Sequence, residues 1–80
     1  MIEWEHHMAV LEAISYHRKQ IVLYEQFATD LENGKRVLMD SNPGEPPRDV
    51  SAEEAAKARR DVVKFKSMIE GYEKLIADNS

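Results

Sequence analysis

The chain of 80 residues contains no cysteine. Disulfide bridges, thiolate metal sites and cysteine nucleophiles are therefore excluded. Domains of this size have only a small core, and many depend on disulfides, bound metal or self-association for their stability. A chain without cysteine is also consistent with a reducing compartment, and we expect a cytoplasmic protein.

Long apolar runs and an excess of positive charge are missing as well. No segment approaches the roughly 18 apolar residues of a membrane span, and the first ten residues lack the basic and apolar regions of a secretory signal. We therefore expect no contact with a membrane. Eleven Lys and Arg residues against fifteen Asp and Glu give a net charge of −4, which disfavours nucleic acid as a partner.

Motifs that carry chemistry are scarce. The sequence has no glycine-rich phosphate loop and no serine in a nucleophile motif. Glu3 and His6 form an E-x-x-H unit, but helical bundles that hold two irons need further glutamates from several helices. Because nothing else in the chain repeats this unit, we expect no enzymatic activity, no cofactor and no metal.

Two long amphipathic segments make up most of the chain. Residues 2–32 contain almost no helix breaker, and Asn33-Gly34 is a typical helix end. Residues 51–78 begin with Ser51 and carry Glu54 three positions later. This spacing predicts a capping box, in which the Ser51 hydroxyl accepts the Glu54 N–H and the Glu54 carboxylate reaches back to the Ser51 N–H. We predict two helices, each about 40–45 Å long.

Apolar residues in both segments recur at alternating steps of three and four, which predicts a coiled-coil-like packing seam. In the first segment Arg18 and Glu25 also fall on this seam. Gly71 interrupts the second segment at a cost of about 1 kcal/mol, so we expect a close neighbour or local flexibility there. The predicted core or oligomer-interface residues are Leu11, Ile14, Ile21, Ala28, Val62, Phe65, Ile69, Tyr72 and Ile76.

Charge predicts how the two helices meet. The first helix ends with acidic residues and the second begins with basic ones, so an antiparallel hairpin places opposite charges side by side, with Glu25 opposite Arg59. We predict an all-α fold with a single domain over residues 1–80. Two helices packed by one face bury little apolar surface, and we therefore expect dimerisation into a four-helix bundle, or a higher oligomer.

The connection over about residues 33–50 contains all three prolines and is longer than a helix–helix connection needs. Three interpretations remain open. The loop is disordered, or it crosses the end of the bundle with Val37, Leu38 and Met39 covering the core, or it is a binding loop on a rigid stem. The apolar trio favours the second interpretation, and a short strand within Arg36–Met39 is also compatible with the sequence.

The order of elements around this loop resembles that of small phage head-completion proteins. The resemblance covers the tetrapeptide from Gly34 to Val37 and the order helix, short segment, helix. The proline-rich stretch departs from the hairpin that those proteins have at this place. The resemblance implies a structural, phage-related subunit, and we assign no family from it.

The polar residues near the first seam allow two interpretations. Arg18 and Glu25 form a buried or interfacial ion pair that fixes the register, or Arg18 and its neighbours, Tyr16 among them, line a cleft for an anionic ligand or an acidic partner. The basic stripe around Lys57, Arg60 and Lys64 is expected to be a solvated face. The candidate contact residues are Arg18, His17, Lys19, Tyr24, Arg36 and Arg48.

Three functions from different classes are compatible with these observations. The first is a non-enzymatic, self-associating helical protein that binds or inhibits a protein partner, as a regulator. The second is an oligomer that binds a small anionic ligand such as a nucleotide. The third is a structural oligomer subunit. The first is our leading hypothesis.

Overall fold

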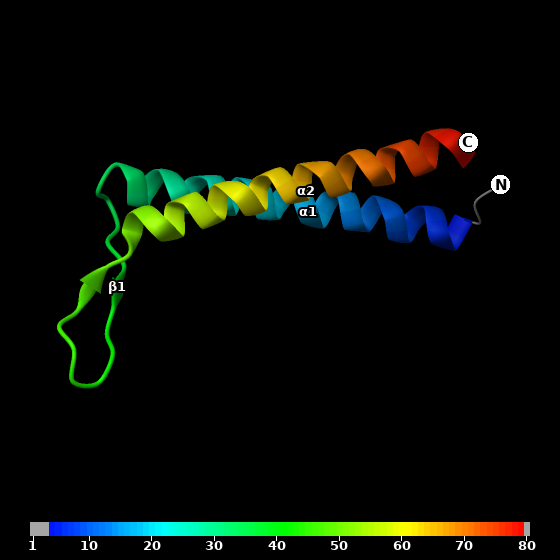
Figure 1. The fold of residues 1–80 in the computed structure, drawn as a ribbon. Coiled ribbons are helices and arrows are strands. Elements are labelled where there is room, and N and C mark those ends of the chain that lie inside the picture. Colours follow the sequence, from blue (N-terminus) through cyan, green and yellow to red (C-terminus); the bar gives the residue numbers. More distant parts are fainter. Residues whose placement is uncertain (1–3, 80) are drawn as a thin grey trace.

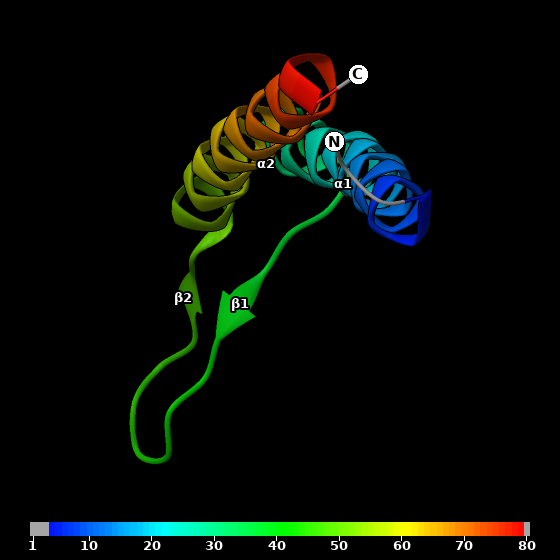
Figure 2. The same cartoon turned by 90° about the vertical axis from the view of Figure 1, so that its right-hand side faces the viewer.

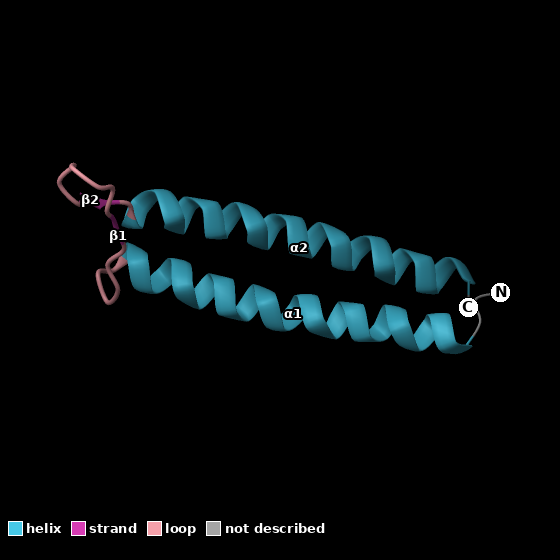
Figure 3. Ribbon diagram, turned by 90° about the horizontal axis from the view of Figure 1, so that it is seen from below, coloured by secondary structure: helices cyan, strands magenta, loops and turns pink. Residues whose placement is uncertain are grey.

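The computed structural model describes residues 4–79. Helix α1 spans Trp4–Glu32 and helix α2 spans Ser51–Asn79. Between them lie two short strands, β1 at Met39–Asp40 and β2 at Arg48–Asp49. The helices run antiparallel, with both chain ends at the end opposite the strands (Figure 1). Seen from below, they lie side by side over their whole length (Figure 3). The predicted hairpin of two long helices is confirmed.

The seam of α2 contains small side chains near the strands and larger ones towards the chain ends. Ala55 and Ala58 are almost completely buried, together with Val62 and Ile69. Phe65, Tyr72 and Ile76 are partly buried at the next positions of the same pattern. No large side chain of the described residues is fully buried. The helix pair therefore has a thin core.

The seam of α1 contains more residues than the apolar pattern predicts. Ile14, Ala28 and Leu31 are buried, whereas Leu11 is exposed. His17 and Tyr24 occupy seam positions as well, because the rings of His17 and Phe65 are stacked and the ring of Tyr24 meets that of Phe65 edge-on. The seam thus comprises Ile14, His17, Ile21, Tyr24, Ala28 and Leu31 in α1, and Ser51, Ala55, Ala58, Val62, Phe65, Ile69, Tyr72 and Ile76 in α2.

Arg18 and Glu25 lie beside the seam and not on it. Each forms an ion pair with α2, and a third pair lies near the strands. In each helix the partners follow one another at intervals of seven residues, so all three pairs report the same register. The pairs are Arg18–Glu73 at 3.9 Å, Glu25–Lys66 at 3.8 Å and Glu32–Arg59 at 2.7 Å.

The predicted Glu25–Arg59 pair is wrong by one heptad. The Arg59 guanidinium donates to both carboxylate oxygens of Glu32, at 2.7 and 3.4 Å, and to the Thr29 hydroxyl at 3.1 Å. Acidic side chains at both 25 and 32 suit the basic start of α2, so charge alone does not select between them. These side chains are exposed, and exposed pairs set a register more than they stabilise a fold.

The start of α2 differs from the predicted capping box. The Ser51 hydroxyl accepts the backbone N–H of Leu38 at 2.9 Å, while the Ser51 N–H donates to the Asp49 carboxylate at 2.8 Å. The Glu54 N–H is satisfied by the Val50 carbonyl at 2.9 Å. The capping box does not form because both groups of Ser51 have other partners. The hydroxyl accepts the Leu38 N–H in place of the Glu54 N–H, and the Ser51 N–H donates to Asp49 in place of Glu54.

The connection is folded into an antiparallel hairpin, with Met39 opposite Asp49 and Asp40 opposite Arg48. We call residues 39–49 the arm, which leaves the helices sideways (Figure 2). Of the predicted apolar trio only Leu38 packs against the core, whereas Val37 and Met39 are more than half exposed. The prediction that the trio caps the core is therefore correct for one residue of three. A hairpin does occupy this place, although the sequence pointed to an irregular segment.

Gly34, just beyond α1, and Gly71, within α2, differ in their need for glycine. Gly34 has φ +80 at the end of α1, and beyond it the Arg36 N–H donates to the Asp30 carbonyl at 3.0 Å. A Cβ added to Gly71 would meet nothing within 4 Å. The expected close neighbour of Gly71 is thus absent from the described residues.

None of the helices within residues 4–79 is long and apolar enough to cross a membrane.

We predict that Gly71→Ala raises the free energy of unfolding by about 1 kcal/mol, because alanine favours the helix and the site is open. Urea unfolding followed by circular dichroism measures the change. The control is Gly34→Ala, which should lower stability by about 1 kcal/mol, since its backbone is left-handed. Destabilisation by Gly71→Ala would contradict the open environment described above.

Candidate functional site

The arm is the most exposed segment of the described chain. Every residue from Met39 to Asp49 is exposed. Gly44, with φ +81, lies in the turn, where the Glu45 N–H donates to the Asn42 carbonyl at 3.1 Å. Residues that bind partners concentrate on such loops when a rigid scaffold positions them. The arm is therefore a candidate contact surface.

Several contacts at the base of the arm fix it to the start of α2. The Val50 N–H donates to the Leu38 carbonyl at 2.9 Å, which continues the pairing of the two strands. The Leu38 N–H donates to Ser51, whose side chain is buried at the helix start. Arg48 forms an ion pair with Glu53 at 3.6 Å. Because Leu38 also packs on the core, the base of the arm has a defined position on the bundle end.

The Asp49 carboxylate and the Glu32 carboxylate are both held in the charged form. Hydrogen bonds from Ser51, first from its side chain and then from its backbone, lower the pKa of Asp49 below its ordinary 3.8. The hydrogen bond from Arg59 lowers the pKa of Glu32 below its ordinary 4.5. A carboxylate with a depressed pKa stabilises the fold above its ordinary pKa and loses that effect as the pH falls.

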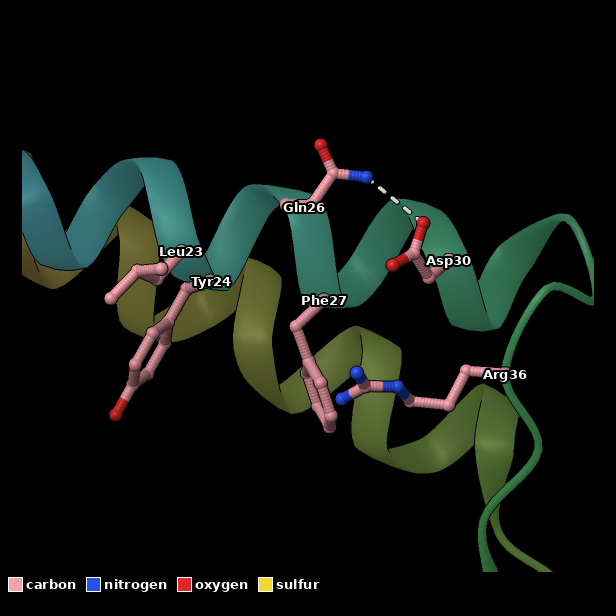
Figure 4. A pocket seen from close by; sticks show the side chains of 6 residues that line it. All are labelled: Leu23, Tyr24, Gln26, Phe27, Asp30 and Arg36. Atoms are coloured by element: carbon pink, nitrogen blue, oxygen red, sulfur yellow. Dashed lines mark hydrogen bonds between the residues drawn. The ribbon is translucent and has the colours of Figure 1, made fainter.

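A hollow of about 500 Å³ lies on α1 beside the base of the arm. The Arg36 guanidinium stands 5.5 Å from the centre of the Phe27 ring, which is within range of a cation–π contact. Gln26 donates to Asp30 at 2.9 Å across the rim (Figure 4). Within residues 4–79 the Arg36 side chain has no ion pair. The lining residues are Leu23, Tyr24, Gln26, Phe27, Asp30 and Arg36.

The structure brings together only two of the candidate contact residues, Tyr24 and Arg36, which both line the hollow. Arg48 lies on the arm, Arg18 is paired with Glu73, and Lys19 is exposed on α1. These side chains do not form one site within a single chain.

His17 lies between the helices and not in a cleft. Its ring is stacked on Phe65 with ring centres 5.5 Å apart, and on Tyr72 at 5.9 Å. The Nδ1 atom is buried and has no hydrogen-bond partner among the described residues. Glu3, the other half of the predicted E-x-x-H unit, lies outside the described residues, and no three metal-binding side chains gather within residues 4–79.

The two broad faces of the helix pair differ in chemistry. Charged residues of the interhelical ion pairs each follow a seam residue by one position, which turns them about 100° to one side. We call this side the ladder face, with residues Arg18, Glu25, Glu32, Arg59, Lys66 and Glu73.

Large apolar side chains each precede a seam residue by one position, so they are turned the opposite way. Leu23 and Phe27 of the hollow belong to this set. The sequence analysis does not include these two residues among the candidate contact residues, because they lie off the seam. Their positions directly before Tyr24 and Ala28 are the sequence signal that places them on one side of the helix. We call this side the apolar face, with residues Tyr16, Leu23, Phe27, Met68 and Leu75.

We predict that Ser51→Ala lowers the free energy of unfolding by about 1–2 kcal/mol, because the Leu38 N–H loses its acceptor at a partly buried site. Ser67→Ala is the matched control, since Ser67 is an exposed serine inside the same helix, and it should change stability by less than about 0.5 kcal/mol. Urea unfolding of both variants measures the difference. Equal effects of the two substitutions would show that the Ser51 hydroxyl does not anchor the arm.

Asp49→Asn should make stability less dependent on pH. Because the folded pKa of Asp49 lies below its ordinary 3.8, the wild type gains from the carboxylate above pH 3.8 and loses this gain as the pH falls through the lower folded pKa. Asparagine keeps an acceptor but does not titrate. The stability gap between wild type and variant, measured by urea unfolding, should therefore shrink below pH 3.8. A gap of constant size would contradict this prediction.

The comparisons with known proteins add no family. No protein-family model matches the chain, and neither the curated proteins nor the solved structures yield a significant match. The functional assignment therefore depends on the geometry of the arm, the hollow and the two faces.

Proposed function

We propose that this protein is a non-enzymatic, self-associating helical hairpin that binds a protein partner and acts as its regulator or inhibitor. The arm and the neighbouring hollow are the proposed contact with that partner. Self-association completes the core that a single helix pair lacks.

The observation that carries this proposal is the large surface of the single chain. It exposes 6099 Å², whereas a compact monomer of 9.2 kDa exposes about 4,900 Å². The excess, about 1,200 Å², exceeds the roughly 800 Å² that each partner buries in a standard interface. The radius of gyration of 17.7 Å similarly exceeds the roughly 12 Å of a compact chain of this length.

Two features support a protein as the partner. The arm presents eleven consecutive exposed residues with their backbone groups, and a hairpin of this kind offers both strand edges and side chains to another chain. The hollow beside it combines apolar walls with the guanidinium of Arg36. Apolar anchors with an arginine are typical of protein contact surfaces.

Native mass spectrometry of the untagged protein from its own cells tests the proposal. We expect an oligomer of at least about twice the 9.2 kDa chain mass, together with a species that carries an additional protein. An added mass of a few hundred daltons would instead favour the small-ligand hypothesis. Growth of the oligomer with concentration, without any added mass, would favour a structural subunit. A monomer at micromolar concentration would contradict the proposed self-association.

A variant without the arm is the control for the protein partner. Residues 40–48 are replaced by a short Gly/Ser linker, which leaves Leu38, Asp49 and Ser51 in the chain. The variant should keep its helix content and its oligomeric state but lose the additional protein. Retention of the partner would remove the arm from the contact.

A further inference from the structure

We infer that the apolar face is the surface on which a second copy of this chain packs. The inference rests on the proposed self-association and adds which side of the hairpin makes the contact. The ladder face then remains in water on the outside of the assembly.

In the half of the hairpin near the chain ends, charge is divided unequally between the two faces. All three interhelical ion pairs within residues 4–79 lie on the ladder face, and each joins an acidic side chain to a basic one. On the apolar face the positions next to the seam in the half near the chain ends are Ala13 and Gln20 in α1 and Met68 and Leu75 in α2. Burying even a paired charge costs desolvation free energy, so the ladder face suits solvent and the uncharged half of the apolar face suits contact.

Large apolar side chains are exposed on both sides of the hairpin. On the ladder side Val22 and Val63 each lie between two residues of the interhelical ion pairs, three and four positions away, whereas the large side chains of the apolar face have no residue of these pairs at those spacings. Leu23 is 61% exposed and Met68 is 48% exposed, and Tyr16 and Leu75 are also exposed. Phe27 is partly exposed in the wall of the hollow. Leu23 and Phe27 lie together in that wall, and exposed apolar patches mark interaction sites.

A second copy is the occupant that the thin core requires. Domains are built from at least two packed layers, and the described chain is a single pair of helices with no large side chain fully buried. A copy placed face to face supplies an identical pair and gives a four-helix bundle. In a two-fold contact the same surface must fit itself, and this face presents both a hollow and exposed side chains such as Met68.

The remaining charged residues that precede seam residues are Asp30 in α1 and Glu54, Lys57, Asp61 and Lys64 in α2, and they alternate in sign along α2. Asp61, which precedes the seam residue Val62, is paired with Lys64 at 4.0 Å within α2. Asp30 at the rim of the hollow accepts from Gln26, and Arg36 is a cation in the same rim. Opposite charges therefore lie near one another on the face, and two copies do not meet with a net repulsion.

The arm borders the same surface. In Figure 2 the arm descends to one side of the helix pair, and in Figure 4 the side chains of Tyr24 and Phe27 point to the side on which the chain leaves α1 for the arm. Arg36, at the base of the arm, contacts Phe27. A copy seated on the apolar face thus lies in the angle between the helices and the arm.

Two matched double variants test the inference by sedimentation equilibrium. Leu23→Glu with Met68→Glu places charges on the apolar face, and Val22→Glu with Val63→Glu places them on the ladder side. Val22 and Val63 are 68% and 67% exposed, at least as much as their counterparts. Each new glutamate follows a basic residue by four positions, so its local charge environment within the helix is similar. The basic residues are Lys19, Lys64, Arg18 and Arg59.

We expect the apolar-face variant to raise the Kd of self-association by at least about 100-fold, as two buried anchors are replaced by charge. The ladder-side variant should stay within about threefold of the wild type. Equal effects, or a larger effect of the ladder-side variant, would overturn the inference while self-association itself stands. A wild type that is monomeric would overturn both the inference and the proposed self-association.

Methionine oxidation of the wild type decides the case even if a charged variant fails to fold. Met68 lies on the apolar face, while Met8 is 40% exposed on the other side, at the heptad position of Val22. Raising the protein concentration through the association range should slow peroxide oxidation of Met68 several-fold and leave that of Met8 unchanged. Equal protection of both, or protection of Met8 alone, would overturn the proposed face.

Discussion

The alignment of the two seams is the constraint on which the rest of the structure depends. Residues at steps of three and four bring Ala28 against the alanines of α2 at one end and His17 against Phe65 and Tyr72 further along. Once these seams are aligned, the positions next to them have a fixed side of the hairpin. The residue before a seam position is rotated by about 100° to one side, and the residue after it by about 100° to the other. The same alignment therefore creates the core, the ladder face and the apolar face.

The sequence predicts the architecture because helix periodicity is a local property. The α2 seam is regular, and its positions from Ala55 to Ile76 are those that face α1. The α1 seam is less regular, since His17 and Tyr24 combine apolar rings with polar atoms and do not stand out as core. Arg18 and Glu25, one residue further along, were placed on the seam instead. Their long side chains lie beside it and reach across to α2.

Features that depend on two distant segments could not be predicted in this way. Ser51 has the local signature of a helix cap, but the N–H of Leu38 arrives through the fold and takes its hydroxyl. The hollow has the same origin, because Arg36 and Phe27 meet only after the chain has turned at Gly34. The prolines of the arm excluded helix correctly, yet nothing local fixed the pairing of Met39 with Asp49.

The order of charges in the ladder protects the hairpin against sliding. In the pairs Glu25–Lys66 and Glu32–Arg59 the acidic residue belongs to α1. In the pair nearest the chain ends, Arg18–Glu73, the acidic residue belongs to α2. If α2 slipped by one heptad in one direction, Glu25 would face Glu73. In the other direction Arg18 would face Lys66. Each slipped alignment therefore contains a repulsive pair, and such repulsion is a recognised means of selecting one pairing over its alternatives.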